Sequence, residues 1–302
     1  MRVKHDVNTK YCCQIGYPLD YSCAAYVHNV MYELANLNAI CLSVEVREHE
    51  LRDFIAATKV MKMLGFDITM PHKSNIIQYL DECDESSRIF KCVNHVKWED
   101  GKLIGIGLDG VGMGMAIAHS NAQIKDSDVL ILGAGAVAGP IAADLCSRGA
   151  RSVVVLNRTV NKAEYIAEKL SDMYGVKTEC GEMNDKNLKK YAGRSNLVVQ
   201  CTSLGAAGHS QDYENVDFID ELPDNATVAD VLYPTTSILT RARERGLKTV
   251  NGMGMLVHQQ IAMMKFRFGI DMPESALKVA EEAVAVAVAM RDFRLAQKAR
   301  QA

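Results

Sequence analysis

The stretch that decides the fold is DVLILGAGAVAG, residues 128–139. The apolar run Val129–Leu132 predicts a strand that is buried on both faces, as in a parallel sheet covered by helices. The residues that follow match the pattern G-x-G-x-x-G/A, and a helical pattern begins directly after them. Strand, glycine turn and helix in this order form the context in which that pattern binds the phosphates of a dinucleotide.

Each key position of this turn has a physical reason. Gly133 permits the tight turn, Gly135 lets the backbone approach a pyrophosphate, and Ala138 lets the helix pack closely on the strand. The helix N-terminus adds free N–H groups and a partial positive charge. A tight turn without a ligand is the alternative interpretation. The cofactor-binding positions predicted here are Gly133, Ala134, Gly135, Ala136, Val137 and Ala138.

The end of the next apolar run, SVVVL, distinguishes between the two nicotinamide cofactors. Folds that are specific for NAD place Asp or Glu at this point, where the acid binds the ribose 2′-hydroxyl and would repel a 2′-phosphate. This chain has Asn157, Arg158 and Thr159 instead, followed by Lys162. Because arginine forms bidentate hydrogen bonds with phosphate, these four residues predict that the cofactor is NADP. A solvated surface charge is the alternative for Arg158.

The pattern around this stretch predicts an α/β protein. Runs such as NLVVQCTS and TVADVLY indicate further parallel strands of a doubly wound sheet, and apolar runs alternate with helical patterns along the chain. Residues 91–109 are expected to form a hairpin that turns at Glu99–Gly101. The alternating run 283–290 is expected to be helical because of its alanines and charged flanks. We predict a substrate domain over 1–112, completed by helices in 254–302, and a Rossmann-type domain over 124–252.

Composition excludes several other classes of protein. The net charge is −3, so nothing indicates binding to nucleic acid or to an anionic membrane. No segment approaches the ~20 apolar residues of a membrane span, and no signal peptide is visible, so a cytoplasmic protein is expected. The nine cysteines form no C-x-x-C and the eight histidines no H-x-x-x-H. We therefore expect reduced thiols and no metal site.

The segment GFDITMPHK, residues 65–73, is the most chemically informative part of the first half. Pro71 suits the first position of a helix, which would place Lys73 in the first helical turn. The helix dipole disfavours a cation there, so this lysine should lose its proton more easily and suit proton transfer. Taken alone, a solvated lysine is the alternative.

Several ordered segments together make the chain resemble the shikimate dehydrogenase family. The family carries G-x-N-V-T-x-P-H-K, G-x-N-T-D-G-x-G, a glycine turn, N-R-T and G-x-x-M-L-x-x-Q. The matching segments, in the same order, are Gly65–Lys73, Gly105–Gly112, Gly133–Ala138, Asn157–Thr159 and Gly252–Gln259. The early segment Pro18–Asn29 also matches in part, so the resemblance extends over residues ~15–265.

The resemblance implies an NADP-dependent oxidoreductase of aromatic amino acid biosynthesis. Such an enzyme interconverts a ring hydroxyl and a ketone on a shikimate-like cyclic polyol, of the shikimate/3-dehydroshikimate type. The implied catalytic pair is Lys73 and Asp109. Two further cofactor positions are implied at Thr202 and Gly252. The implied substrate-binding positions are Ser22, Asp67, Thr69, Asn94, Tyr233 and Gln259.

Several departures from the family pattern concern the substrate. The family binds the substrate carboxylate with two serines, of which Ser22 remains while Ala24 replaces the second. Asp67 replaces an asparagine, and Gly107 and Leu108 replace the N-T before Asp109. These changes predict a divergent paralogue, with quinate or another amino- or hydroxy-substituted ring as the alternative substrate. A metabolite sensor without enzymatic activity is the other alternative, and either a monomer or a homodimer is expected.

Overall fold

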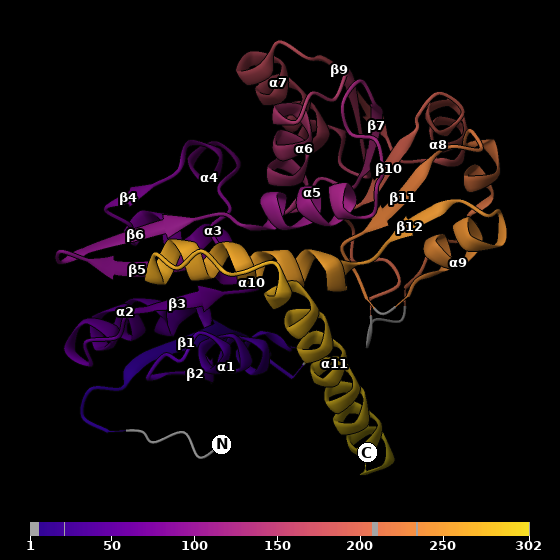
Figure 1. Ribbon diagram of the computed structural model, residues 1–302. Helices are drawn as coiled ribbons and strands as arrows, with labels where there is room; N and C mark the ends of the chain where they lie inside the picture. The colour runs from indigo at the N-terminus through magenta and orange to yellow at the C-terminus, as the bar shows by residue number, and fades with distance from the viewer. Residues whose placement is uncertain (1–5, 21, 207–210, 234, 302) are drawn as a thin grey trace. The chain divides into compact units, whose positions relative to one another are not determined.

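The computed structural model describes residues 6–20, 22–206, 211–233 and 235–301 (Figure 1). The chain forms two compact units. Unit 1 comprises Met1–Leu108 with Leu256–Ala302, and unit 2 comprises Asp109–Met255. Among the described residues, no helix combines the length and the apolar character needed to cross a membrane.

Unit 1 is built on a six-stranded mixed sheet with the order β2-β1-β3-β5-β6-β4. β1 runs parallel to β2 and β3, whereas β5 is antiparallel to β3 and β6. The predicted hairpin is confirmed: Asp100 and Gly101 form its turn, with φ of 49° and 80°. Positive φ at both turn residues matches the twist of the flanking strands. The strands are β1 (Lys10–Gly16), β2 (Ala39–Glu45), β3 (Gly65–Ile68), β4 (Glu82–Cys83), β5 (His95–Glu99) and β6 (Lys102–Ile106).

Helices cover this sheet. α2 packs on an apolar core that includes Ile15, Phe66 and Val96. The expected helix 283–290 is confirmed as part of α11, which packs along α1. The helix expected to begin at Pro71 is short: α3 ends at Asn75 and continues only as a single 3₁₀ turn before β4. The helices are α1 (Ala24–Leu34), α2 (Leu51–Val60), α3 (His72–Asn75), α4 (Glu85–Phe90), the later part of α10 (Gly252–Phe268) and α11 (Ser275–Gln301).

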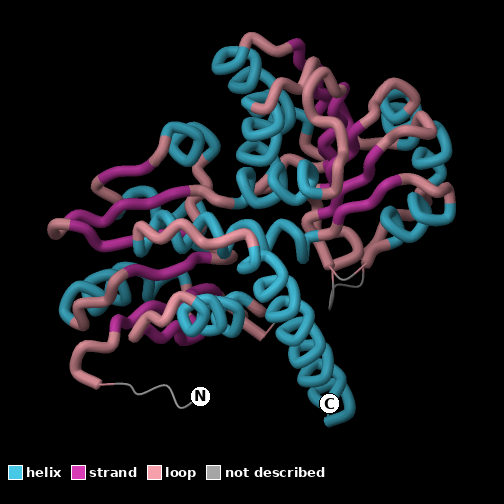
Figure 2. Tube along the Cα trace, in the orientation of Figure 1, coloured by secondary structure: helices cyan, strands magenta, loops and turns pink. Residues whose placement is uncertain are grey.

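Unit 2 is a fully parallel sheet with the order β12-β11-β10-β7-β8-β9, so the predicted α/β fold with a doubly wound domain is confirmed. The chain starts at β7, winds outward to β9, and then returns to β10 on the other side. Strands alternate with helices along this part of the chain (Figure 2). Ligands of such sheets bind at the carboxyl ends of the strands where the order reverses, here between β7 and β10. The strands are β7 (Asp128–Leu132), β8 (Ser152–Asn157), β9 (Lys177–Glu182), β10 (Leu197–Gln200), β11 (Thr227–Asp230) and β12 (Lys248–Val250).

Helices lie on both faces of the sheet of unit 2. α5, α6 and α7 lie on one face, and α8 and α9 on the other (Figure 1). Sequence patterning missed the edge strands β9 and β12. β9 has no apolar run, because its side chains are only partly buried, and β12 has three residues. The helices are α5 (Asp109–His119), α6 (Ala138–Ser147), α7 (Val160–Tyr174), α8 (Asp185–Ala192) and α9 (Ser237–Glu244).

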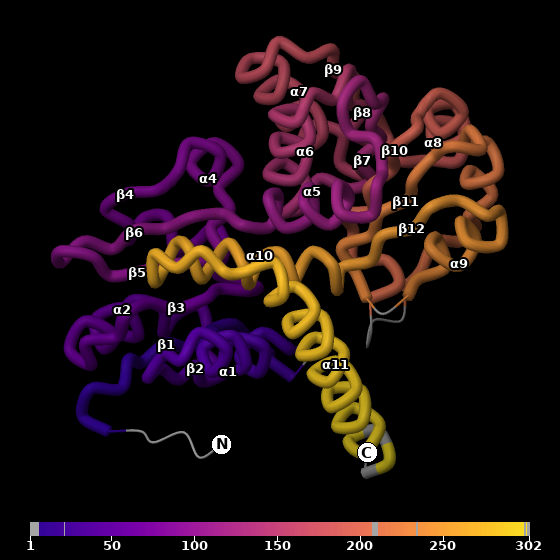
Figure 3. Tube along the Cα trace, viewed as in Figure 1, coloured from indigo at the N-terminus to yellow at the C-terminus, as the bar shows by residue number. Residues whose placement is uncertain are grey.

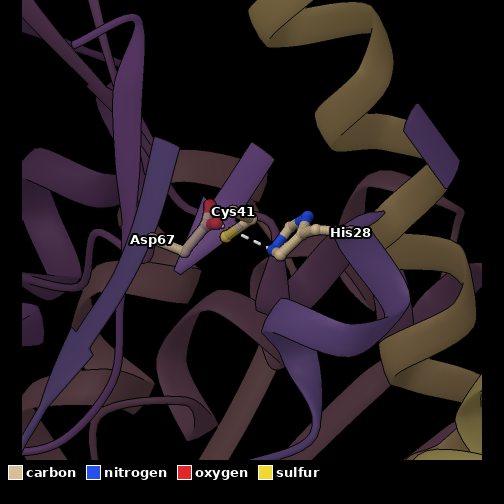
Figure 4. A group of neighbouring side chains, drawn as sticks. All are labelled: His28, Cys41 and Asp67. Carbon is tan, nitrogen blue, oxygen red and sulfur yellow. Dashed lines mark ion pairs between the residues drawn. The ribbon is translucent and has the colours of Figure 1, made fainter. Parts of the chain in front are cut away.

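A carboxylate is buried in unit 1 on the face of β3 opposite Phe66. Oδ1 of Asp67 lies 2.7 Å from Nη2 of Arg267 and 2.5 Å from Nδ1 of His95. Oδ2 lies 2.7 Å from Nε2 of His28 (Figure 4). Asp67 stays a predicted substrate-binding residue; in unit 1 its carboxylate contacts these three partners and its side chain is 4% exposed.

Asp67 and Arg267 carry opposite charges in this cluster. Burial opposes ionisation of Asp67, but Arg267 and the imidazoles outweigh it and hold the pKa of Asp67 well below its ordinary value. Burial lowers the pKa of His95 below its ordinary value, although Asp67 acts in the opposite direction. Donor atoms of His28, Cys41 and Asp67 also lie within 4.8 Å of one another, as metal ligands do (Figure 4). However, burial raises the pKa of the Cys41 thiol well above its ordinary value, and Arg267 already neutralises Asp67. We therefore interpret the cluster as an ion pair supported by two histidines.

The ion pair generates a stability prediction. Asp67→Asn leaves the Arg267 guanidinium buried without its counter-charge, so we expect the free energy of unfolding to fall by about 3–5 kcal/mol. Chemical denaturation followed by circular dichroism measures this loss. Adding Arg267→Met should recover much of it, because the double variant removes both buried charges. The exposed pair Lys102–Glu82 is the control, since Glu82→Gln should cost about 1 kcal/mol or less. A double variant no more stable than Asp67→Asn alone would contradict the interpretation.

Candidate active site

The glycine turn of unit 2 joins β7 to α6. Gly133 has φ of +100°, and a Cβ there would lie 2.7 Å from Cγ2 of Thr202, so both backbone and space require glycine. At Gly135 the nearest atom to a Cβ would be the carbonyl oxygen of Cys201 at 3.6 Å, an ordinary contact. The packing of unit 2 therefore does not itself require glycine at 135. Ala138 is fully buried at the start of α6.

Asn157 connects the glycine turn to the end of β8. Its Oδ1 accepts a hydrogen bond from the Ala134 N–H at 3.1 Å, and its Nδ2 donates to the Thr159 carbonyl at 2.9 Å. Arg158, Thr159 and Lys162 are exposed around the N-terminus of α7. The side chain of Asn157 thus connects the two segments predicted to contact the cofactor. The cationic side chains of Arg158 and Lys162 follow it in the sequence.

The N-terminus of α5 is held tightly against α6. A Cβ on Gly110 would lie 2.2 Å from the Pro140 carbonyl oxygen, and one on Gly114 would lie 1.7 Å from Oδ2 of Asp144. Asp109, the first residue of α5, is buried. These two glycines therefore fix Asp109 relative to the helix that follows the glycine turn. The sequence pattern did not reveal this role, although G-x-x-x-G spacing places both glycines on one face of a helix.

Thr202 and Tyr233 follow neighbouring strands of unit 2. Oγ1 of Thr202 accepts a hydrogen bond from the Leu204 N–H at 3.1 Å, just beyond β10. Beyond β11, a Cβ on Gly252 would lie 2.1 Å from the Val231 carbonyl oxygen and 2.9 Å from the Tyr233 ring. Gly252 thus permits close packing against the segment that carries Tyr233.

Asp230 is a further residue of this region that sequence analysis missed. Its carboxylate accepts hydrogen bonds from the Thr236 hydroxyl at 2.6 Å and the Leu232 N–H at 2.8 Å. Burial raises the pKa of Asp230 to about 6. A buried acid at the carboxyl end of β11 holds in place the turn that leads to Tyr233. The apolar residues around it in the sequence made it resemble an ordinary strand end.

In unit 1, three predicted residues lie on neighbouring segments. The Ile68 N–H donates to the Asn94 carbonyl at 2.9 Å, next to Thr69, and the Val93 N–H donates to the Lys73 carbonyl at 2.9 Å. These backbone bonds bring the segments carrying Thr69, Lys73 and Asn94 together. Oδ1 of Asn94 also accepts from the N–H of Leu108 at 2.7 Å, the residue before Asp109.

The environment of Lys73 differs in one respect from the expectation. Pro71 precedes α3 as its cap residue, whereas the first helical position is His72. α3 has four residues, and the macrodipole sums the peptide dipoles along a helix. The dipole argument for easier deprotonation of Lys73 is correspondingly weaker than a long helix would make it.

The start of α1 carries the remaining predicted contacts of unit 1. The Ser22 hydroxyl donates to Oε1 of Gln14 and accepts from the Ala24 N–H at 3.4 Å. Ala24 begins α1 and is buried. Gln259 is buried within α10. The Ser22 hydroxyl is thus already engaged inside unit 1, and the position of the second family serine offers no hydroxyl.

Comparisons with known proteins give the family. Residues 15–96 match the model of the shikimate dehydrogenase substrate binding domain, and residues 116–234 match that of shikimate / quinate 5-dehydrogenase. The shikimate dehydrogenase (NADP(+)) of Alkaliphilus oremlandii is 34% identical over 89% of this chain and 95% of its own.

Solved structures agree with this result. A shikimate dehydrogenase in complex with NADP+ superposes with a TM-score of 0.82 at 28% identity, over 94% of this chain and 98% of its own. Ligand-free 5-ketofructose reductase of Gluconobacter sp. strain CHM43 superposes with a TM-score of 0.81 at 26% identity, over 93% of this chain and 99% of its own. The chain therefore belongs to the shikimate dehydrogenase family, and the predicted enzyme class, an oxidoreductase, is confirmed.

Proposed function

We propose that this protein is an NADP-dependent dehydrogenase that interconverts a ring hydroxyl and a ketone on a shikimate-like cyclic polyol. The observation that carries the proposal is the backbone pairing that brings the segments of Lys73, Thr69 and Asn94 together. A lysine that can take up and release a proton, with a hydroxyl and an amide nearby, is the chemistry needed to bind a polyol and to accept its proton. The family relative from Alkaliphilus is named as an NADP(+) enzyme that acts on shikimate.

The residues of unit 2 suit NADP. Gly135 is a glycine that the unit's own packing does not require, as expected where a backbone must approach a pyrophosphate. Arg158 and Lys162 are exposed at the N-terminus of α7, and residues 157–162 contain no acid that would repel a 2′-phosphate. NADP, when bound, supplies or accepts the hydride.

The proton chemistry is assigned to Lys73 and Asp109. In the direction of oxidation the substrate hydroxyl loses a proton as its carbon loses a hydride, so a basic group must take that proton. Lys73 exchanges this proton with the reacting oxygen. Asp109, the second member of the proposed pair, accepts a hydrogen bond from a hydroxyl of the substrate.

A second candidate substrate class has a specific observation in its favour. The Ser22 hydroxyl is hydrogen-bonded to Gln14, and Ala24 has none, so the start of α1 is poorly equipped to bind a carboxylate. A polyhydroxylated ketone without a carboxylate, of the kind named for the Gluconobacter relative, would not need those hydroxyls. The same Lys73 chemistry would then reduce an uncharged substrate.

Replacement of Lys73 tests the assignment of the proton carrier. Lys73→Ala should lower kcat by roughly two to four orders of magnitude, the usual contribution of an acid–base group. NADPH affinity, measured by fluorescence titration, should remain close to that of the wild type. Lys278→Ala, at an exposed position on α11, is the matched control and should leave kcat unchanged. A Lys73→Ala variant with half of the wild-type turnover would overturn the assignment.

Replacement of Arg158 tests cofactor recognition. Arg158→Ala should raise the KM for NADP by roughly ten- to a hundredfold and leave the KM for NAD nearly unchanged, because only NADP carries a 2′-phosphate. Steady-state kinetics with both cofactors provide the comparison. Lys186→Ala, another exposed cation of unit 2, should change neither value. Equal losses with both cofactors would mean that Arg158 does not bind the phosphate.

Restoring the missing hydroxyl tests substrate specificity. Ala24→Ser should raise kcat/KM for shikimate by roughly ten- to a hundredfold, the value of one hydrogen bond to a charged group. Reduction of an uncharged polyhydroxylated ketone should not improve, and Ala25→Ser is the control one residue along. A wild type with kcat/KM for shikimate of about 10⁴ M⁻¹s⁻¹ or more, combined with no gain in Ala24→Ser, would contradict the idea of an altered substrate.

A further inference from the structure

The C-terminal helix α11 has two apolar faces. One face packs along α1 and contains the buried residues Ala280, Val284 and Ala287. The other face is exposed in the middle of the helix: Val286 is 45% exposed, Met290 47% and Phe293 65%. α11 continues as one uninterrupted helix to the C-terminal end of the described chain (Figure 3). A contiguous line of exposed apolar side chains is typical of an interaction surface.

The exposed apolar residues follow a heptad. Val286, Ala289, Phe293 and Ala296 are spaced by three, four and three residues, which is the a/d spacing of a coiled coil. We call these four residues the α11 seam. The same line continues four residues further at each end, to exposed Glu282 on one side and exposed Arg300 on the other. The seam therefore has one acidic end and one basic end.

We propose that the α11 seam pairs antiparallel with the same seam of a second copy of this chain. In that register Phe293 lies opposite Ala289 of the other copy, and Val286 lies opposite Ala296, so each large side chain meets a small one. The register also places Glu282 opposite Arg300 at both ends. Every pair joins an a position to a d position, as antiparallel helices require.

The charges favour this arrangement over other partners and orientations. A parallel pair would place Glu282 against Glu282 and Arg300 against Arg300, which are repulsive contacts. Glu282 and Arg300 lie at equal distances from the centre of the seam, so a second copy of the chain presents the opposite charge to each of them. The line from Glu282 to Arg300, which contains the α11 seam, is about 27 Å long at 1.5 Å per residue. Because this is a short interface, association should depend on protein concentration.

Charge reversal provides the sharpest test, with sedimentation equilibrium of the full-length chain across the micromolar range as the measurement. The wild type should dimerise reversibly. Glu282→Arg and Arg300→Glu should each weaken self-association by roughly tenfold or more, because each replaces two attractive pairs by two repulsive ones. An equimolar mixture of the two single variants should form heterodimers again, since every facing pair is then of opposite charge. The double variant should also dimerise.

A second variant addresses the apolar part of the seam. Phe293→Glu should yield a monomer whose circular dichroism and thermal midpoint match those of the wild type, because Phe293 contributes little to the fold of one chain. Val60→Glu, at the 81% exposed end of α2, is the control and should leave the dimer intact. A wild type that stays monomeric throughout the range would overturn the proposal. A dimer indifferent to Phe293→Glu, or single variants that do not recover on mixing, would overturn it as well.

Discussion

The ion pair between Asp67 and Arg267 is the constraint on which the arrangement of unit 1 depends. A buried carboxylate must have a buried counter-charge, and here the counter-charge comes from α10, 200 residues away in the chain. β3 leads directly to Thr69 and Lys73, and α10 carries Gln259. One electrostatic requirement therefore fixes, relative to each other, two elements that supply residues to the proposed substrate site.

Local patterns predicted the parts of the structure that depend on neighbours in the chain. The continuous apolar strands, the glycine turn at Gly133 and the hairpin at Gly101 each follow from backbone preference or burial of a few adjacent residues. The partners of Asp67 could not be predicted in this way. Within its motif it stood in the place of a neutral amide, whereas its real partners are His28, His95 and Arg267. A carboxylate's role depends on which charge lies nearby, and motif position does not contain that information.

The two units differ in how closely they follow the family pattern. Unit 2 keeps the glycine turn and the segment after β8. At Gly110 and Gly252 another part of the backbone lies so close that no side chain would fit. In unit 1 the start of α1 has changed, while Lys73 and Asn94 remain. The residues proposed to bind the cofactor and to carry the proton are separate from those at the start of α1, which the family uses to bind the substrate carboxylate. We therefore expect the hydride transfer to be the same across the family while the substrate differs.

The two hydrogen bonds of Asn157 have a consequence for attempts to redesign the cofactor preference. An acid introduced there to attract the ribose of NAD would keep an acceptor for the Ala134 N–H but would lose the donor to the Thr159 carbonyl. The new carboxylate would then face an unpaired carbonyl dipole, and the turn before α7 would lose its anchor. Arg158 is the better position for such a substitution, because its side chain is exposed and its replacement keeps both hydrogen bonds of Asn157.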